Sequence, residues 1–460
     1  MTLLAARPSS GAAARREPAS RPAPRPAATL RVVAIADADS YVKWAATMLD
    51  SVTGIDARML IVRTPLTVSR AQERTALAGT ALAAGEPAAR AVSRVTHGGI
   101  ATRLHALRAD VVLIGGRGPF VRLVQREIDR LADRPVVVTG MPGISIPAQA
   151  GAVKYRRHSD LLVVHSLRER RAFAELSRRL GIDVPLGLAT LPFARPRERA
   201  SGGTDLVFAA QAIVPRSPDE RQRLADVLVA AAKAHPERRV VIKLRSRAGE
   251  NETHYEQTPL VDLLRERPDN LVVSYDPMTT ALQTAEGLVT IGSTAAIEAL
   301  AMGVPVIALD EFGVRKTLLN TAFRASGLLG GADDVIARRF RHPDPTWAVD
   351  NYFHDAAEST WWTQVTELVE QRRRGTLAPR PVPPPRGGAL HTAFERKSVL
   401  GNEDRTLSGA LALAVGVPLA GAIVRLRRHR HRGAAHSWTD ESGDLTVTPA
   451  LYHDPIRRPR

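Results

Sequence analysis

The sequence predicts an α/β protein with two doubly wound, Rossmann-like domains that face each other across a cleft. Short apolar runs rich in β-branched residues alternate with stretches of helical periodicity, which is the pattern of a parallel sheet covered by helices. The pattern occurs twice, on the two sides of a stretch at 192–203 that mixes Pro, Arg, Ser and Gly. With 460 residues, the chain is long enough for two such domains and two tails.

The composition excludes several kinds of chemistry. The chain contains no Cys, so disulfides, thiolate metal sites and Cys nucleophiles are excluded. The net charge of +17 is concentrated at the ends, with five Arg and one Glu in 1–29 and sixteen basic and eight acidic residues in 370–460. The chain between them is nearly balanced and has neither zinc-finger spacing nor an aromatic–basic RNA motif. We therefore expect no nucleic-acid partner.

Four regions are expected along the chain: a disordered tail at 1–29, an N-terminal domain at 30–195, a C-terminal domain at 204–375, and a region at 376–460 with a Pro-rich linker and a basic tail. The N-terminal tail lacks the apolar segment of a signal peptide, so we expect a cytoplasmic protein.

In the N-terminal domain, apolar runs predict strands at 30–36, 57–62, 110–114, 135–139, 161–165 and 184–191. Helices are predicted at 41–49, 68–84, 88–108 and 120–131, with a basic helix ending at 180. Gly115 and Gly116 follow the third strand without forming a G-x-G-x-x-G motif, so we expect no dinucleotide cofactor. They either line an acceptor pocket or form a plain turn.

In the C-terminal domain, strands are predicted at 206–210, 240–244, 271–274, 288–291 and 304–309, and helices at 218–234 and 358–374. The segment 288–313 is central to the predicted site. Gly292 ends a buried strand, and Ser293 or Thr294 supplies a hydroxyl at the start of a helix. Free backbone N–H groups and the positive end of the helix predict an anion site there, and small residues let a phosphate approach.

A second anion site is predicted at the end of the strand at 240–244. Lys243 and Arg245 are two residues apart and therefore point to one face of the strand. Burial of both cations is unfavourable unless an anion accompanies them. The alternative is a strand edge exposed to solvent.

The run at 298–306, EALAMGVPV, resembles the nucleotide-binding run E-A-x-A-x-G-x-P-V of two-domain glycosyltransferases with the GT-B fold. In that family the Glu usually hydrogen-bonds the donor ribose, and the preceding residues hold the donor diphosphate. The resemblance implies these roles for Glu298 and for Ser293 and Thr294. The alternative is a solvent-facing Glu298. Many retaining members carry a second Glu where this chain has Thr290, which favours an inverting enzyme.

The run VIKLR at 241–245 resembles the I-K-x-H-P strand end of capsule and teichoic-acid transferases, of the polysialyltransferase and CDP-glycerol glycerophosphotransferase types. Those enzymes also carry a Ser-Ser or Ser-Thr pair like Ser293-Thr294. Arg245-Ser246 replaces His-Pro here, so a role for that His in protonating the leaving phosphate does not carry over.

Glycosyl transfer requires a base that removes the proton of the acceptor hydroxyl. Asp37 and Asp39 follow the first strand, at the sheet edge where open α/β sheets bind ligands. Asp39 is the first candidate base and Asp37 the second; alternatively, Asp39 or Ser40 only caps the following helix. Asp310, after the last strand, is a further candidate for the cleft.

These features predict an inverting glycosyltransferase that moves a sugar from a nucleotide-activated donor to a glycan or lipid-linked acceptor of the cell surface. No metal and no cofactor are expected, because no His cluster has metal-ligand spacing and no Asp-x-Asp motif lies in the donor domain. The alternatives are a sugar-nucleotide epimerase, a polyol-phosphate transferase and a non-catalytic scaffold that binds a nucleotide sugar.

The segment 406–424 is uncharged and is followed by RLRRHRHR. An apolar segment beside a basic run predicts contact between 406–432 and an anionic membrane surface. A spanning helix and a soluble segment are the alternatives.

Overall fold

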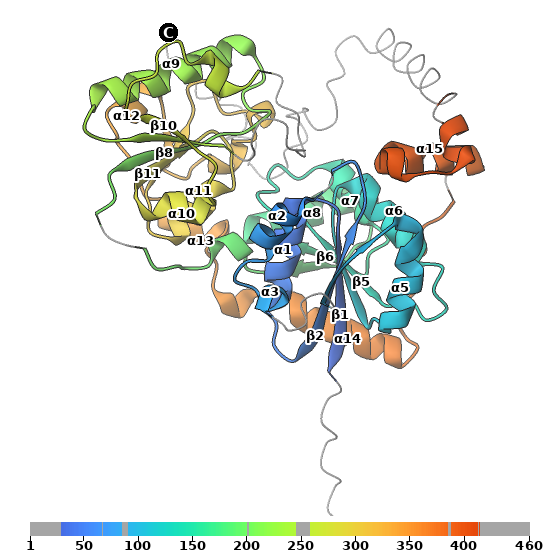
Figure 1. Cartoon of the computed structure of the whole chain (residues 1–460). Coiled ribbons are helices and arrows are strands. Elements are labelled where there is room, and N and C mark those ends of the chain that lie inside the picture. Colours follow the sequence, from blue (N-terminus) through green and yellow to red (C-terminus); the bar gives the residue numbers. More distant parts are fainter. Residues whose placement is uncertain are drawn as a thin grey trace, which may run out of the picture.

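A computed structural model describes residues 29–66, 68–84, 91–199, 202–244, 258–384, 388–412 and 414. Within these residues, the N-terminal domain contains a seven-stranded parallel sheet with the order β3-β2-β1-β4-β5-β6-β7. Figure 1 shows its strands β1, β2, β5 and β6 with helices on both sides. Its strands are β1 (Leu30–Ala36), β2 (Ile55–Val62), β3 (Val92–Val95), β4 (Val111–Gly115), β5 (Val136–Gly140), β6 (Leu161–Val164) and β7 (Leu186–Leu188). Its helices are α1 (Asp39–Asp50), α2 (Arg70–Leu77), α3 (Ala81–Ala84), α5 (Ile100–Leu107), α6 (Gly118–Ile128), α7 (Ala150–Arg156) and α8 (Leu167–Leu180).

The C-terminal domain contains, in the described residues, a six-stranded parallel sheet with the order β10-β9-β8-β11-β12-β13. Its strands are β8 (Asp205–Ala209), β9 (Val240–Lys243), β10 (Leu271–Ser274), β11 (Ala285–Thr290), β12 (Val306–Leu309) and β13 (Leu329–Gly330). Its helices are α9 (Pro218–Ala234), α10 (Met278–Gln283), α11 (Ala295–Ala301), α12 (Ala332–Ile336) and α13 (Pro345–Asp350). The predicted pair of doubly wound domains is confirmed.

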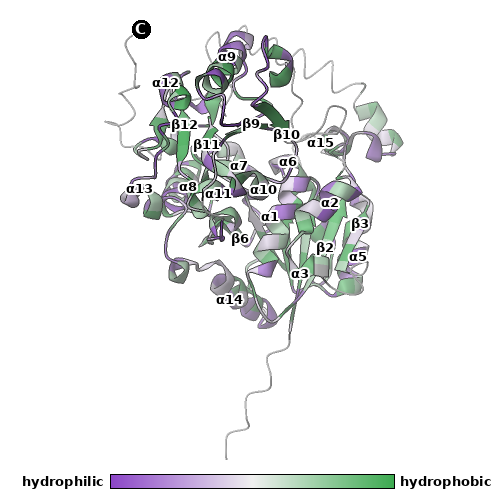
Figure 2. Ribbon diagram, turned by 60° about the vertical axis from the view of Figure 1, so that its left-hand side comes forward, coloured by the Kyte–Doolittle hydropathy of each residue, from purple (hydrophilic) through white to green (hydrophobic). Residues whose placement is uncertain are grey.

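The apolar strands are explained by their burial on both faces. Five consecutive residues of β1 are buried, and every residue of β4, β5 and β6 is buried. Helices cover both sides of a parallel sheet, so its central strands are apolar throughout and do not alternate. Figure 2 shows the result, with hydrophobic strands such as β2 inside and helices that mix hydrophilic and hydrophobic residues outside.

Each sheet has one point at which the strand order reverses. β1 lies between β2 and β4, and β8 lies between β9 and β11. Open α/β sheets bind ligands outside the carboxyl ends of their strands at such points. Asp37 directly follows β1, and Gly292 comes two residues after β11. Both predicted site regions therefore lie at a ligand-binding edge.

The predicted helix at 88–108 is wrong in its first half. Residues Val92–Val95 form β3, which pairs with β2 at the edge of the sheet, and the helix α5 begins only at Ile100. The 3-10 turn His97–Gly99 connects the two elements. The predicted helix at 68–84 is likewise divided into α2 and α3, with Gly79 between them at a φ of +75°.

The boundary predicted at 375 differs from the structure. Helix α14 (Trp361–Arg373) packs under the N-terminal sheet, where Trp361, Val365 and Val369 join the core built on β1, β4 and β5. The amide of Thr360 also donates to the carbonyl of Leu188 in β7, at 2.9 Å. The chain thus returns to the N-terminal domain after completing the C-terminal one.

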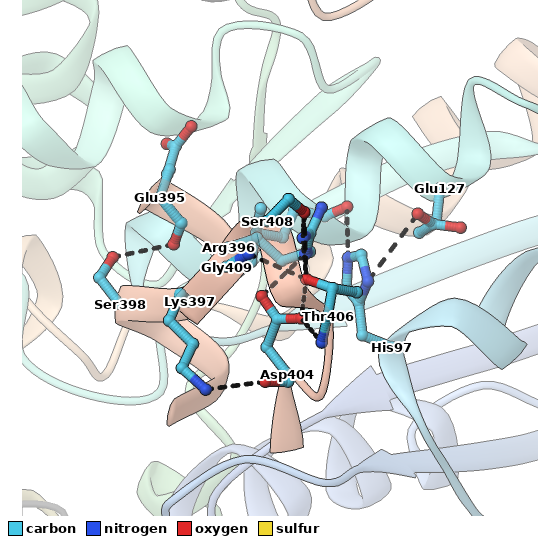
Figure 3. A network of polar contacts seen from close by, with 11 residues as sticks. His97, Glu127, Glu395, Arg396, Lys397, Ser398, Asp404, Thr406, Ser408 and Gly409 are labelled. Atoms are coloured by element: carbon cyan, nitrogen blue, oxygen red, sulfur yellow. Dashed lines mark hydrogen bonds and ion pairs between the residues drawn. The ribbon is translucent and has the colours of Figure 1, made fainter. Parts of the chain in front are cut away.

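A further helix that was not predicted, α15 (Gly388–Leu400), packs on α6 of the N-terminal domain and continues into a 3-10 turn at Gly401–Glu403 (Figure 1). Glu395 forms ion pairs of 3.0 and 2.9 Å with Arg122 and Arg126 of α6. Figure 3 shows the neighbouring contacts, in which Asp404 accepts from Arg396. This segment is held to the N-terminal domain by both charge and apolar packing, since Val399 and Leu400 are buried in its core.

Among the described residues, no helix is long and apolar enough to cross a bilayer. The description ends within the predicted apolar segment 406–424, so 413 and 415–432 lie outside it.

Candidate functional site

The turn between β11 and α11 is built by internal hydrogen bonds. Thr290 is fully buried, and its hydroxyl donates to the carbonyl of Ala209 and accepts from the amide of Ser293. A Cβ on Gly292 would lie 2.5 Å from the carbonyl oxygen of Leu319, so glycine is required by the chain's own packing. An ionised glutamate in place of Thr290 would bury a charge beneath the turn and could not donate to the carbonyl of Ala209.

Most amides of this turn already have partners. The amides of Gly292, Ser293 and Ala295 donate to Gln211 Oε1, Thr290 Oγ1 and Ser293 Oγ, at 2.9, 3.3 and 3.2 Å. The predicted array of free N–H groups is therefore largely used within the domain. The half-buried side chains of Ser293 and Thr294 are the groups of this turn that can contact a ligand.

Glu298 is not the solvent-facing residue of the alternative interpretation, since its side chain is only 8% exposed. Its Oε1 lies 3.5 Å from Arg197 Nη1 and 4.0 Å from Lys43 Nζ. A charge-assisted hydrogen bond normally measures about 2.7–2.9 Å. The carboxylate is thus buried beside two cations but bound closely by neither, and it can accept further donors.

The two cations come from different parts of the chain. Lys43 belongs to α1 of the N-terminal domain, and its ammonium lies 4.8 Å from the centre of the Phe193 ring. Phe193 and Arg197 belong to the linker between the domains. Lys43, Phe193, Arg197 and Glu298, here termed the Glu298 cluster, therefore join the N-terminal domain, the linker and the C-terminal domain.

Asp39 lies on the same side of α1 as Lys43, because residues four apart in a helix share a face. The N-cap of α1 is Ala38, without a side-chain hydrogen bond, so neither Asp39 nor Ser40 is the cap of the alternative interpretation. Asp39 is half-buried in the first turn. The structure thus places Asp39 on the helix face that carries the Glu298 cluster.

A second contact between the domains involves the loop after β5. The amide of Ile144 lies 3.5 Å from Thr294 Oγ1, and a Cβ on Gly143 would lie 2.6 Å from the same atom. Thr294 and Glu298 are four residues apart, so the face of α11 that bears both is directed toward the N-terminal domain.

This loop is held in place by Glu169 of α8. Its fully buried carboxylate accepts hydrogen bonds from the amides of Ser145 and His165, at 2.9 and 2.8 Å, and from the hydroxyl of Tyr352, at 2.8 Å. Tyr352 follows α13 of the C-terminal domain. Burial raises the pKa of Glu169, while these donors act in the opposite direction.

Asp37 is completely buried at the end of β1. Neither of its carboxylate oxygens has a hydrogen-bond partner of normal geometry among the described residues. Burial raises the pKa of Asp37 from 3.8 to about 7, against the smaller opposing effects of Arg117 and of the Thr64 hydroxyl. Asp37 is thus partly protonated near neutral pH, and in this conformation no solvent reaches it.

The other predicted donor residues lie farther away. Lys243 is buried rather than exposed, and its ammonium donates to the carbonyl of Leu244. Strand β8 separates it from β11, which corresponds to about 10 Å across two strand spacings. Arg245 lies outside the described residues. Asp310, at the end of β12, is buried, and its carbonyl accepts from the amide of Gly313.

Gly115 and Gly116 are explained by packing. A Cβ on Gly115 would lie 3.2 Å from the Trp44 ring, and one on Gly116 would lie 2.2 Å from the Phe120 ring. Both glycines are buried, so the structure gives them a packing role and places neither in the Glu298 cluster. The described residues contain no group of three or more His, Asp or Glu side chains that could hold a metal ion.

Sequence reasoning missed Lys43, Phe193, Arg197, Gly143 and Glu169 as parts of this region. Gly143 had a signal, since it lies in a Gly- and Pro-rich loop after a strand, and so did Lys43, which lies one helical turn after the candidate base Asp39. The others depend on how the domains meet, which no local pattern encodes.

Residues 32–368 match the model of the family described as "Putative glycosyltransferase (DUF6716)". The chain belongs to this family. The predicted assignment to glycosyltransferases, and with it the prediction of an enzyme, is thereby confirmed at the level of the family. Helix α15 lies beyond the residues that match.

No curated protein sequence is significantly similar to this member of the family. Several solved structures are similar over most of their length. The UDP-GlcNAc 2-epimerase of Methanocaldococcus jannaschii is 12% identical, with a TM-score of 0.48 over 74% of this chain and 99% of that one. The Neisseria meningitidis UDP-GlcNAc 2-epimerase, bound to UDP-GlcNAc, is 12% identical, with a TM-score of 0.46 and coverages of 74% and 100%.

The glycosyltransferase SnogD from Streptomyces nogalater is 15% identical, with a TM-score of 0.39 and coverages of 77% and 96%. At such TM-scores and identities, these similarities establish neither a shared activity nor a shared substrate.

The contact between Gly143 and Thr294 yields a test of the domain interface. We expect Gly143→Ala to lower the free energy of unfolding by about 1–3 kcal/mol, because the new methyl group overpacks against Thr294 Oγ1. Thr294→Ala removes that oxygen and leaves its Cβ about 3.6 Å away, so the double variant should lose less than the sum of the single losses. Urea unfolding measures each value. Gly151→Ala, where a Cβ meets nothing within 4 Å, is the control. If the loss of the double variant equalled the sum of the single losses, the contact between Gly143 and Thr294 would be contradicted.

The buried Asp37 predicts a pH dependence of stability. Its pKa is about 7 in the folded protein and near 3.8 in the unfolded chain, so between these values only the folded state holds the proton. Wild-type stability should therefore fall as pH rises from 4 toward 7, by up to about 1.4 kcal/mol per pH unit. Asp37→Asn does not titrate and should gain stability relative to wild type over this range. Urea unfolding at pH 5, 6, 7 and 8 measures the difference; a constant difference would show that Asp37 does not titrate as described.

Proposed function

We propose that this protein is an inverting glycosyltransferase whose donor, a nucleotide-activated sugar, binds at the Glu298 cluster. The observation that carries the proposal is the buried, loosely paired Glu298 carboxylate on the α11 face directed at the N-terminal domain. A ribose presents two adjacent hydroxyl donors, and a buried carboxylate with free acceptor capacity suits them. Membership of a glycosyltransferase family supports this donor class.

The donor diphosphate is proposed to lie next to Ser293 and Thr294, one helical turn from Glu298. The hydroxyls of both residues can donate to phosphate oxygens. Lys243, Arg245 and Gly292 belong to the proposed donor region through the resemblance of their motifs. Lys243 would have to act across β8, since the sheet order separates it from the turn.

Asp39 is the proposed base for the acceptor hydroxyl. It is half-buried and shares a helix face with Lys43, whereas Asp37 is sealed from solvent. A base must reach the hydroxyl from which it removes the proton. This chain has Thr290 where many retaining glycosyltransferases of the GT-B fold carry a second Glu, and this difference favours an inverting reaction. We propose that the reaction requires neither a metal nor a cofactor.

The proposed acceptor is a glycan or lipid-linked glycan of the cell surface, reached from the cytoplasmic face of the membrane. Leu407 and Leu411, 89% and 64% exposed, lie four residues apart and present one apolar helical face. Five Arg follow in the sequence RLRRHRHR. An exposed apolar segment that a basic run follows in the sequence suits an anionic lipid surface. We also propose that the protein is related to the capsule and teichoic-acid transferases.

A donor panel tests the proposed function. CMP-, UDP-, GDP- and CDP-linked donors are added to the purified protein and thermal unfolding is followed. A ligand present at about 100 times its Kd should stabilise the folded state by roughly 2.7 kcal/mol. Glu298→Gln should reduce this stabilisation, because the amide has one acceptor oxygen fewer for the ribose hydroxyls and no negative charge. No shift with any donor would contradict the proposal, and conversion of the donor without an acceptor would favour an epimerase.

The assignment of the base has a test of its own. We expect Asp39→Asn to lower the turnover number about 10²- to 10⁴-fold without weakening donor binding, because the amide cannot accept the proton. The measurement is transfer to acceptor under saturating donor, with donor affinity measured separately. Asp37→Asn is the matched comparison. Full turnover in Asp39→Asn, with loss only in Asp37→Asn, would reverse the two roles.

A further inference from the structure

We propose that Lys43 and Arg197 are donor-binding residues that leave Glu298 for the donor diphosphate when the ribose takes their place. This inference rests on the donor role proposed above for Glu298. It adds two cationic side chains, one from the N-terminal domain and one from the linker, to the donor-binding residues proposed in the C-terminal domain.

The first argument is the shortage of free donors at the turn. The amides of Gly292, Ser293 and Ala295 are bonded within the domain, so they are not available to a phosphate without rearrangement. A diphosphate carries two negative charges, and two hydroxyls alone do not neutralise them. Lys243 lies about 10 Å from β11, across two strand spacings, so charged donors closer to the turn have to come from other side chains.

The second argument is the loose attachment of the two cations. Lys43 Nζ and Arg197 Nη1 lie 4.0 and 3.5 Å from Glu298 Oε1, longer than a charge-assisted hydrogen bond. Their side chains are 38% and 40% exposed, so both can change conformation without disturbing the core. The Phe193 ring, 4.8 Å from the Lys43 ammonium, supports the side chain without fixing its position.

The third argument is reach. Thr294 and Glu298 are one helical turn apart, which corresponds to about 6 Å along the axis of α11. A phosphate beside Thr294 is thus about one turn from the present position of both cations. A lysine side chain spans a comparable length, and the fork of an arginine binds phosphate in a bidentate manner.

Donor binding would then connect three parts of the chain. Ribose hydroxyls on Glu298, with Lys43 and Arg197 on the phosphates, join α1, the linker and α11 through one ligand. Because Asp39 lies on the same face of α1 as Lys43, the donor would also fix the proposed base relative to the reacting sugar.

The test compares affinities for a nucleoside diphosphate and for the matching nucleoside, measured by calorimetry on the full chain with the best base from the donor panel. Wild type should prefer the diphosphate. Lys43→Gln and Arg197→Gln should each reduce that preference about tenfold or more, because the phosphate contact is lost while the ribose still binds Glu298. Lys43→Arg, which keeps the charge, should retain it. Lys154→Gln, an exposed lysine of α7, is the control.

The outcomes separate this inference from the proposed function. If wild type binds no nucleotide, the donor proposal itself fails. If wild type binds the diphosphate and Glu298→Gln weakens binding, but Lys43→Gln and Arg197→Gln keep the full preference for diphosphate, the donor proposal stands and this inference is overturned. Tighter diphosphate binding in Lys43→Gln would overturn it as well, because it would show that Lys43 only competes with the ligand for Glu298.

Discussion

The buried carboxylate of Glu169 is the interaction on which the arrangement of the two domains depends. It accepts from the amides of Ser145 and His165 and from the hydroxyl of Tyr352, so one side chain joins α8, the loop after β5 and the C-terminal domain. Three donors compensate for the cost of burying this group, and without it all three would be left unpaired. The Arg168 guanidinium adds a bond of 3.1 Å to the carbonyl of Ala322.

What Glu169 positions is the loop that meets the donor domain. Ser145 is fixed by the carboxylate, and the adjacent Ile144 contacts Thr294 at the start of α11. The proposed donor region is therefore not a property of the C-terminal motifs alone. Its shape is set by a glutamate in the other domain and by a glycine, Gly143, that permits the approach.

The sequence predicted the elements that depend on local patterns. Buried parallel strands are continuous apolar runs. Helix α9 was predicted with its observed bounds, because Pro218 marks its first turn and the Ala-rich sequence after it has helical periodicity. The edge strand β3 was missed because none of its residues is fully buried and its neighbours are rich in Ala. Glu298, Ser293 and Thr294 were found through a motif that coincides with a strand, a turn and a helix.

The residues that the sequence could not provide are those whose partners lie far along the chain. Lys43 and Glu298 are 255 positions apart, and neither spacing nor periodicity connects them. Lys243 and Arg245 were grouped with the donor turn on chemistry alone, and the strand order then placed β8 between Lys243 and that turn. Distances across a sheet follow from topology, which a local motif does not encode.

The return of α14 to the N-terminal sheet has a consequence for biosynthesis. Trp361, Val365 and Val369 cover an apolar face that the first seven strands leave open. During translation those strands emerge first, and their cover follows only after the whole C-terminal domain has been made. The nascent N-terminal domain must therefore keep this face exposed, or shielded by a chaperone, while about 170 further residues are synthesised.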